Sequence, residues 1–232
     1  MAQRKGGGGS GRRTKAVRVH RAKGRKASST RWLHRHLNDP YVQEARATGY
    51  RSRAAFKLLQ LDKRFHFLRR DARVLDLGAA PGGWSQVAAE KVGPGGRVVA
   101  IDILPMDPIP GVEVVTADIE SEAGLAASRD LLGGPADVVL SDMAPATTGH
   151  AATDHLRIVR LCEAGLAAAE ELLAPGGTFV AKVFQGGAQG ELLDRLKERF
   201  AVVRHAKPPA SRQESPETYV VAQDFRPVGP AR

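Results

Sequence analysis

A short apolar segment that runs directly into a glycine-rich turn constrains the fold of this chain more than any other feature. Residues 73–77 (RVLDL) lead into Gly78, Gly82 and Gly83, and a helical pattern then continues over residues 83–92. Glycine has no Cβ, so the backbone can bend sharply and approach a ligand closely. The helix points free N–H groups and its positive dipole end toward that ligand. The stretch therefore predicts a nucleotide site at the carboxyl end of the first strand of an open α/β sheet.

The spacing of the glycines narrows the class of ligand. A dinucleotide-binding turn has the pattern G-x-G-x-x-G, whereas Gly78 and Gly82 are separated by Ala-Ala-Pro. The chain also lacks the G-x-x-x-x-G-K-[ST] pattern of phosphate-binding NTPase loops. These two differences weigh against NAD, FAD and NTP hydrolysis. From the turn alone, the alternative to a nucleotide site is a glycine turn in an unrelated α/β protein.

Strand and helix patterns alternate through the rest of the chain. After the opening strand, apolar strands are expected at residues 96–104, 112–119, 136–143, 178–184, 201–206 and 218–225. Helices are expected from Pro40, from Ser52, and over residues 125–132, 153–173 and 190–200. Such alternation predicts a Rossmann-like, seven-stranded, mostly parallel sheet with helices on both faces.

The positive charge of the chain is concentrated in its first 36 residues. The formal net charge is +10, yet 12 of the 35 basic residues precede Asp39, which is the first acidic residue. The segment 1–36 is rich in glycine and serine and poor in large apolar residues, which predicts a flexible basic arm that attracts RNA phosphates. A solvated tail without a partner and a transit peptide are the alternatives. We expect a single domain at 37–226, a short tail at 227–232, and no membrane span, since no apolar run approaches 18 residues.

Charged residues follow the predicted strands. Asp102 ends the second strand, 20 residues after Gly82, where an acid accepts hydrogen bonds from ribose hydroxyls in open nucleotide-binding sheets. Asp142 ends the strand ADVVLSDM, and Lys182 lies inside the apolar strand TFVAKVF. A buried lysine is costly unless it has a partner or a function. Because the carboxyl ends of parallel strands share one edge, we expect these side chains to meet there.

The single cysteine and the histidines point to no further chemistry. Cys162 has apolar neighbours at helical spacing, which predicts a core thiol and excludes an internal disulfide. The histidines match no ligand spacing, so we expect no metal site.

Six segments of this chain resemble, in the same order, the FtsJ/RlmE family of ribosomal RNA 2′-O-methyltransferases. They are GYRSRAAFKL, VLDLGAAPGGWSQ, LPMDP, SDMAP, AKVFQG and SPETYVVA, and the likeness covers about residues 38–225. The resemblance implies a class I methyltransferase fold and S-adenosyl-L-methionine as cofactor. It assigns a catalytic tetrad to Lys57, Asp142, Lys182 and Glu217. It assigns cofactor binding to Gly78, Gly82, Gly83, Trp84, Asp102, Asp118 and Asp142, with Asp118 at the adenine amino group.

The same resemblance implies a substrate and a cellular setting. We expect a monomeric cytoplasmic enzyme that methylates a ribose, by resemblance that of a uridine, in the RNA of the large ribosomal subunit. A related enzyme acting on transfer RNA or on a messenger RNA cap would share the tetrad. A non-catalytic RNA-binding assembly factor is the alternative from another class, although it would have no use for the buried lysine. Lys182 could accept the hydroxyl proton if neutral, or only orient the hydroxyl.

Overall fold

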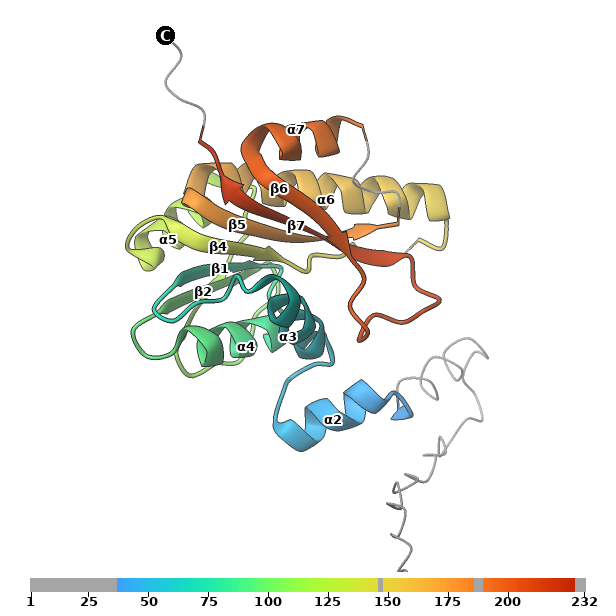
Figure 1. Cartoon of the computed structure of the whole chain (residues 1–232). Coiled ribbons are helices and arrows are strands. Elements are labelled where there is room, and N and C mark those ends of the chain that lie inside the picture. The colour runs from blue at the N-terminus through green and yellow to red at the C-terminus, as the bar shows by residue number, and fades with distance from the viewer. Residues whose placement is uncertain (1–36, 146–147, 186–189, 228–232) are drawn as a thin grey trace, which may run out of the picture.

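The structure is a computed structural model that describes residues 37–145, 148–185 and 190–227. The predicted arm at 1–36 and most of the predicted tail lie outside the described residues. Within them, seven strands form one sheet in the order β3-β2-β1-β4-β5-β7-β6 (Figure 1). The pairs among β3, β2, β1, β4 and β5 are parallel, and β7 runs antiparallel to both β5 and β6. The predicted seven-stranded, mostly parallel sheet is therefore confirmed.

The elements follow the predicted alternation closely. The strands are β1 (Arg73–Leu77), β2 (Arg97–Asp102), β3 (Val112–Thr116), β4 (Ala136–Ser141), β5 (Leu173–Phe184), β6 (Phe200–Ala206) and β7 (Glu217–Phe225). The helices are α2 (Pro40–Thr48), α3 (Ala54–Phe65), α4 (Gly83–Val92), α5 (Glu122–Leu132), α6 (Ala151–Leu172) and α7 (Glu191–Arg199). The two ends of α2 are set by caps that the sequence indicates. The Asp39 side chain accepts a hydrogen bond from Tyr41 N at the start of the helix, and Gly49 ends it with φ 84°.

Helices cover both faces of the sheet, as Figure 1 shows. Alternate strand residues point to opposite faces. Val74, Val138 and Val180 pack with α3 and α4, while Leu75, Val139 and Phe179 pack with α6 and α7 in a second cluster. Cys162 is buried in this second cluster, and burial raises the pKa of its thiol to about 12. The prediction of a core thiol is therefore confirmed.

One strand begins earlier than the sequence suggests. The expected helix 153–173 and strand 178–184 leave a Pro-Gly-Gly turn at residues 175–177 between them, but β5 already begins at Leu173, directly after α6. Leu173 pairs with Ala136, and regular pairing resumes at Thr178, so the turn is accommodated as an irregularity inside the strand. Gly176 has φ +80°, which only glycine adopts readily. Among the described helices, none is long and apolar enough to cross a membrane.

Candidate active site

The four tetrad residues converge at the carboxyl edge of the sheet. Asp142 directly follows β4, Lys182 lies near the end of β5, and Glu217 begins the antiparallel strand β7. Lys57 reaches the same edge from α3. Lys182 Nζ lies 2.8 Å from Asp142 Oδ1 and donates to the Asp142 backbone carbonyl at 2.7 Å. Lys57 Nζ lies 2.8 Å from each carboxylate oxygen of Glu217. Two lysines and two carboxylates therefore form a buried cluster whose formal charges cancel.

Tyr219 connects the two ion pairs, and the sequence analysis did not identify it. Its hydroxyl accepts a hydrogen bond from Lys57 Nζ at 3.1 Å and donates to Asp142 Oδ1 at 2.7 Å. The residue is fully buried and pairs with Lys182 across the β5–β7 ladder. A signal for it was present, because Glu217 and Tyr219 lie two apart in a strand and so share one face.

The charges in this cluster shift the pKa values of its acids. Burial raises the pKa of Asp142, but the nearby Lys182 and Lys57 charges and the hydrogen bonds outweigh it, so the net shift is downward. Burial and the neighbouring Asp142 and Glu217 carboxylates raise the pKa of the Tyr219 hydroxyl well above its usual value. Asp142 is therefore a carboxylate that accepts hydrogen bonds, and Tyr219 remains a neutral donor near neutral pH.

The segment just before α3, the helix that contains Lys57, is hydrogen-bonded to α4, the helix after the glycine turn. The Gln86 side chain of α4 accepts from Arg51 N at 2.8 Å and donates to Gly49 O at 3.1 Å. The Arg51 guanidinium donates to the backbone carbonyls of Pro81, Asp107 and Pro108. One short segment before α3 thus fixes the glycine turn and the loop after β2, and it positions Lys57 as well.

A cavity of about 380 Å³ adjoins the tetrad at the carboxyl ends of β1, β2 and β4. Its lining includes Gly78, Asp102, Asp118 and Asp142, together with apolar side chains such as Ile101 and Leu161. Such a pocket, mostly apolar with a few convergent polar groups, is typical of a small-molecule site. Asp142 belongs to both the cavity and the tetrad, so the two sites are continuous.

Gly78 and Asp102 shape this cavity. Gly78 has φ +67°, and a Cβ there would lie 2.4 Å from Met143 Cγ, so no larger residue fits. Asp102 Oδ2 accepts from Ala80 N at 2.9 Å, and Oδ1 accepts from Leu104 N at 2.8 Å. Each carboxylate oxygen keeps a second lone pair for a ligand. Asp118 is exposed, and its Oδ1 accepts from Glu120 N at 2.9 Å.

Three other predicted cofactor residues do not line this cavity. A Cβ on Gly82 would lie 2.4 Å from Ile109 Cδ1, and one on Gly83 would lie 2.4 Å from Ser52 Oγ. The Trp84 indole is buried, donates to Ala54 O at 2.8 Å and stands 5.6 Å from the Tyr219 ring. In this structure, Gly82, Gly83 and the Trp84 side chain therefore pack the turn against its neighbours. Over the described ranges, no group of three or more His, Cys, Asp or Glu side chains could hold a metal ion.

Comparison with known proteins gives a consistent result. The family model of FtsJ-like methyltransferases matches residues 50–225. A protein of Paramagnetospirillum magneticum named ribosomal RNA large subunit methyltransferase E is 62% identical over 221 residues, which cover 93% of this chain and 91% of that protein. A protein of the same name from Acidiphilium cryptum is 58% identical, with 93% and 95% covered. A Plasmodium falciparum crystal structure described as a ribosomal RNA methyltransferase is 31% identical with a TM-score of 0.66, covering 76% of this chain and 98% of that one.

Proposed function

The chain belongs to the FtsJ-like methyltransferase family, and from this premise we propose that it methylates the 2′-hydroxyl of a uridine ribose in large-subunit ribosomal RNA. The chain is an enzyme that uses S-adenosylmethionine. The observation that carries the proposed reaction is the continuous network in which Tyr219 connects the Lys57–Glu217 and Lys182–Asp142 pairs, beside the cofactor cavity. We also propose that the protein acts in the cytoplasm, where ribosomal RNA is its substrate.

The cavity suits the cofactor. Its apolar walls fit an adenine ring, and Asp102 lies at the end of β2, where such sheets bind ribose hydroxyls. We assign Asp118 to the adenine amino group and Asp142 to the methionine part, which carries a positive charge. When bound, S-adenosylmethionine supplies an electrophilic sulfonium methyl group. The absence of a Cβ at Gly78 lets Met143, which also lines the cavity, pack directly against the turn.

Lys182 is the residue that we place at the reacting hydroxyl. Its ammonium group has three N–H bonds, and Asp142 takes two of them through its carboxylate and its backbone carbonyl. Among the described residues the third has no partner, so it can hold the ribose oxygen in line with the methyl group and stabilise the negative charge that develops there. In its contacts with Asp142, Lys182 Nζ acts as a hydrogen-bond donor and ion-pair partner. We therefore propose that Lys182 orients the hydroxyl, and that the proton leaves late to water.

A methyl-transfer assay tests the proposed function. The full chain is incubated with labelled S-adenosylmethionine and either undermodified large ribosomal subunits, naked ribosomal RNA or transfer RNA, and the modified nucleotide is mapped. We expect label on one ribose 2′-oxygen of the large-subunit RNA. Label on transfer RNA alone would redirect the substrate assignment. Binding of ribosomal RNA without label transfer would support the non-catalytic assembly factor instead.

Replacing Asp102 with alanine should weaken cofactor binding by about tenfold or more, because hydrogen bonds to a charged group contribute about 1.5–3 kcal/mol. The change removes the proposed ribose acceptor and releases the turn that Asp102 Oδ2 holds through Ala80 N. Isothermal titration with S-adenosylmethionine measures the effect. Asp107→Ala is the control, because only the backbone carbonyl of Asp107 takes part in the Arg51 contacts. Equal affinity of the Asp102→Ala and wild-type proteins would remove Asp102 from the site.

Deleting residues 1–36 should weaken RNA binding and flatten its salt dependence. The segment contains twelve basic residues and no acidic one, and each phosphate contact adds about 0.7–0.9 to the slope of log affinity against log salt. Binding of a large-subunit RNA fragment at several salt concentrations measures both quantities. Cofactor affinity, which depends on the folded domain, is the internal control. An unchanged slope would make the arm a solvated tail.

A further inference from the structure

Ser211 lies behind the tetrad and contacts one of its members directly. Its side chain is 5% exposed, and Oγ donates to Glu217 Oε1 at 2.7 Å. The same Glu217 oxygen lies 2.8 Å from Lys57 Nζ. Ser211 is not among the residues that line the cofactor cavity, and the resemblance assigned it no role. Its hydroxyl is therefore a buried donor whose acceptor is a catalytic carboxylate.

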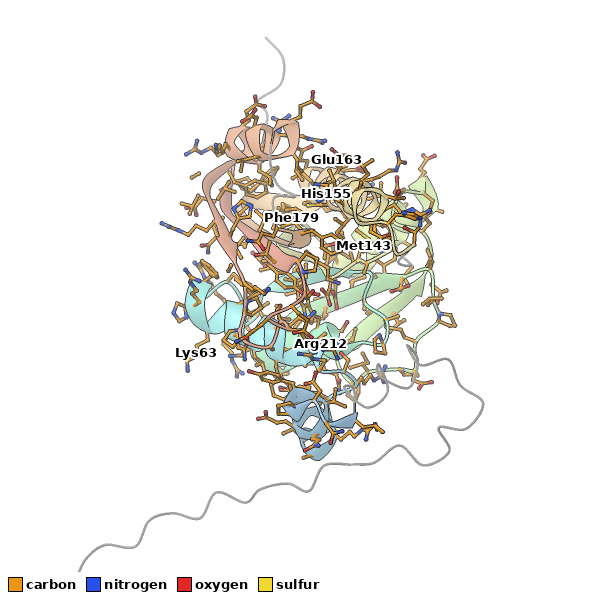
Figure 2. The ribbon with its side chains drawn as sticks, turned by 90° about the vertical axis from the view of Figure 1, so that its right-hand side faces the viewer. Lys63, Met143, His155, Glu163, Phe179 and Arg212 are labelled. Carbon is orange, nitrogen blue, oxygen red and sulfur yellow. The ribbon has the colours of Figure 1, made fainter. Side chains whose placement is uncertain are left out.

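The loop that carries Ser211 is fixed from the other end of the chain. Ala210 N donates to the Gln60 side chain at 2.7 Å, and Ala210 O accepts from the Arg53 guanidinium. Arg212 lies 3.3 Å from Asp39, the N-cap of α2, which also pairs with Arg53 at 2.7 Å. Figure 2 shows Arg212 between α2 and the sheet. The residues on both sides of Ser211 are thus held by contacts with α3 and with the N-caps of α2 and α3, through the backbone of Ala210 and the side chain of Arg212.

Ser211 also begins an unbroken series of contacts that ends at Lys182. Ser211 donates to Glu217, Lys57 donates to Glu217 and Tyr219, and Tyr219 donates to Asp142, which pairs with Lys182. Each contact is between 2.7 and 3.1 Å long. If Glu217 turned away, Lys57 would lose its counter-charge and its direction toward Tyr219. The rotamer of Glu217 therefore determines how Lys57 is held against Tyr219, which in turn contacts Asp142.

We propose that Ser211 is a positioning residue, which holds the Glu217 carboxylate in the orientation that the tetrad requires. This proposal rests on the proposed function, because it assigns Ser211 to the same methyl transfer. Ser211 touches no reacting atom in this scheme. Its contribution is made entirely through Glu217, and this dependence gives the proposal a test that a general packing role would fail.

A double-mutant cycle with Glu217 provides the test. Single-turnover methylation is measured with saturating cofactor and RNA for the wild type, Ser211→Ala, Glu217→Ala and the double variant. We expect Ser211→Ala to lower the rate about tenfold, which is the usual consequence of losing one hydrogen bond to a charged group. In the Glu217→Ala background, the same change should alter the rate less than twofold, since the acceptor is already gone. Cofactor affinity should be unchanged by Ser211→Ala.

Ser128→Ala is the matched control. Ser128 is also fully buried, but its hydroxyl donates to Gly124 O inside α5, away from the tetrad. We expect this variant to methylate at the wild-type rate. A tenfold loss from Ser211→Ala in both the wild-type and Glu217→Ala backgrounds would overturn the proposal, because the effects would then be independent. A wild-type rate for Ser211→Ala would also overturn it. If the wild-type protein itself methylates no RNA, the proposed function fails instead.

Discussion

Replacing Lys182 with alanine should lower the single-turnover rate of RNA methylation by roughly 10²–10³-fold, the range for loss of one donor that stabilises a developing negative charge on oxygen. The variant loses the only N–H group that the tetrad leaves free to orient the ribose oxygen in our scheme. It also leaves the buried Asp142 carboxylate with one cationic partner fewer. Cofactor binding should change far less than the rate, because Lys182 does not line the cofactor cavity. Rapid-quench transfer of labelled methyl to RNA measures the rate.

Lys197→Ala is the control for this experiment. Lys197 is exposed in the last turn of α7, so its loss removes an equal charge without touching the tetrad. Thermal unfolding of both variants separates a catalytic defect from a loss of structure. A folded Lys182→Ala protein that still methylates at close to the wild-type rate would contradict the proposed mechanism.

Most of the scaffold could be predicted from the sequence, because its signals are local. The strand, glycine turn and helix at residues 73–92 combine an apolar run with a change of hydrophobic period, and the structure has each element where the pattern places it. Asp39 and Gly49 likewise mark both ends of α2. The start of β5 was predicted too late because Leu173 pairs with Ala136 across the sheet, and this tertiary pairing outweighs the local tendency of Pro175, Gly176 and Gly177 to break a strand.

The residues of the site likewise divide into those that a local sequence signal indicated and those that it did not. Strand-end position indicated Asp102, Asp142 and Lys182, and the structure brings them to one edge. The pairing of Lys57 with Glu217 spans 160 residues, and only family resemblance could anticipate it. The sequence analysis missed Tyr219 and Ser211 because a tyrosine in an apolar strand and a serine in a loop do not stand out in a sequence. Their function depends on which polar atoms the fold places beside them.

The strand that leads into the glycine turn contains a carboxyl group without full hydrogen bonding. Asp76 in β1 is completely buried, Oδ2 lies 2.6 Å from Ser85 Oγ of α4, and Oδ1 has no hydrogen-bond partner within the part of the chain that the structure describes. Burial, opposed by the Ser85 hydrogen bond and reinforced by the Asp142 and Asp102 carboxylates, raises the pKa of Asp76 to about 7. The two lysines of the tetrad, Lys182 and Lys57, are paired with Asp142 and Glu217. A neutral Asp76 can donate through Oδ2 to Ser85, whereas an ionised one leaves a buried charge only partly satisfied.

Asp76→Asn should therefore stabilise the folded protein, and increasingly so as pH rises. Between its ordinary value of 3.8 and about 7, the unfolded chain releases the Asp76 proton while the folded chain retains it. The protonated Asp76 carboxyl makes its full contribution to the stability of the folded protein below pH 3.8. This contribution is lost as the pH rises through about 7. The full loss is at most about 4 kcal/mol, since one pH unit corresponds to about 1.36 kcal/mol.

Urea unfolding of Asp76→Asn and the wild type at several values from pH 5 to pH 8 measures this dependence. The advantage of the variant should grow by roughly 2–3 kcal/mol over that interval and level off above the folded pKa. Asp130→Asn, which changes an exposed carboxyl in α5, should give a difference that is flat with pH. A flat difference for Asp76→Asn as well would mean that Asp76 is ionised throughout, with a counter-charge that the fold does not explain. The expected slope would mean that Asp76 holds a proton in the folded protein. Asp76 lies two residues before Gly78, which lines the cofactor cavity.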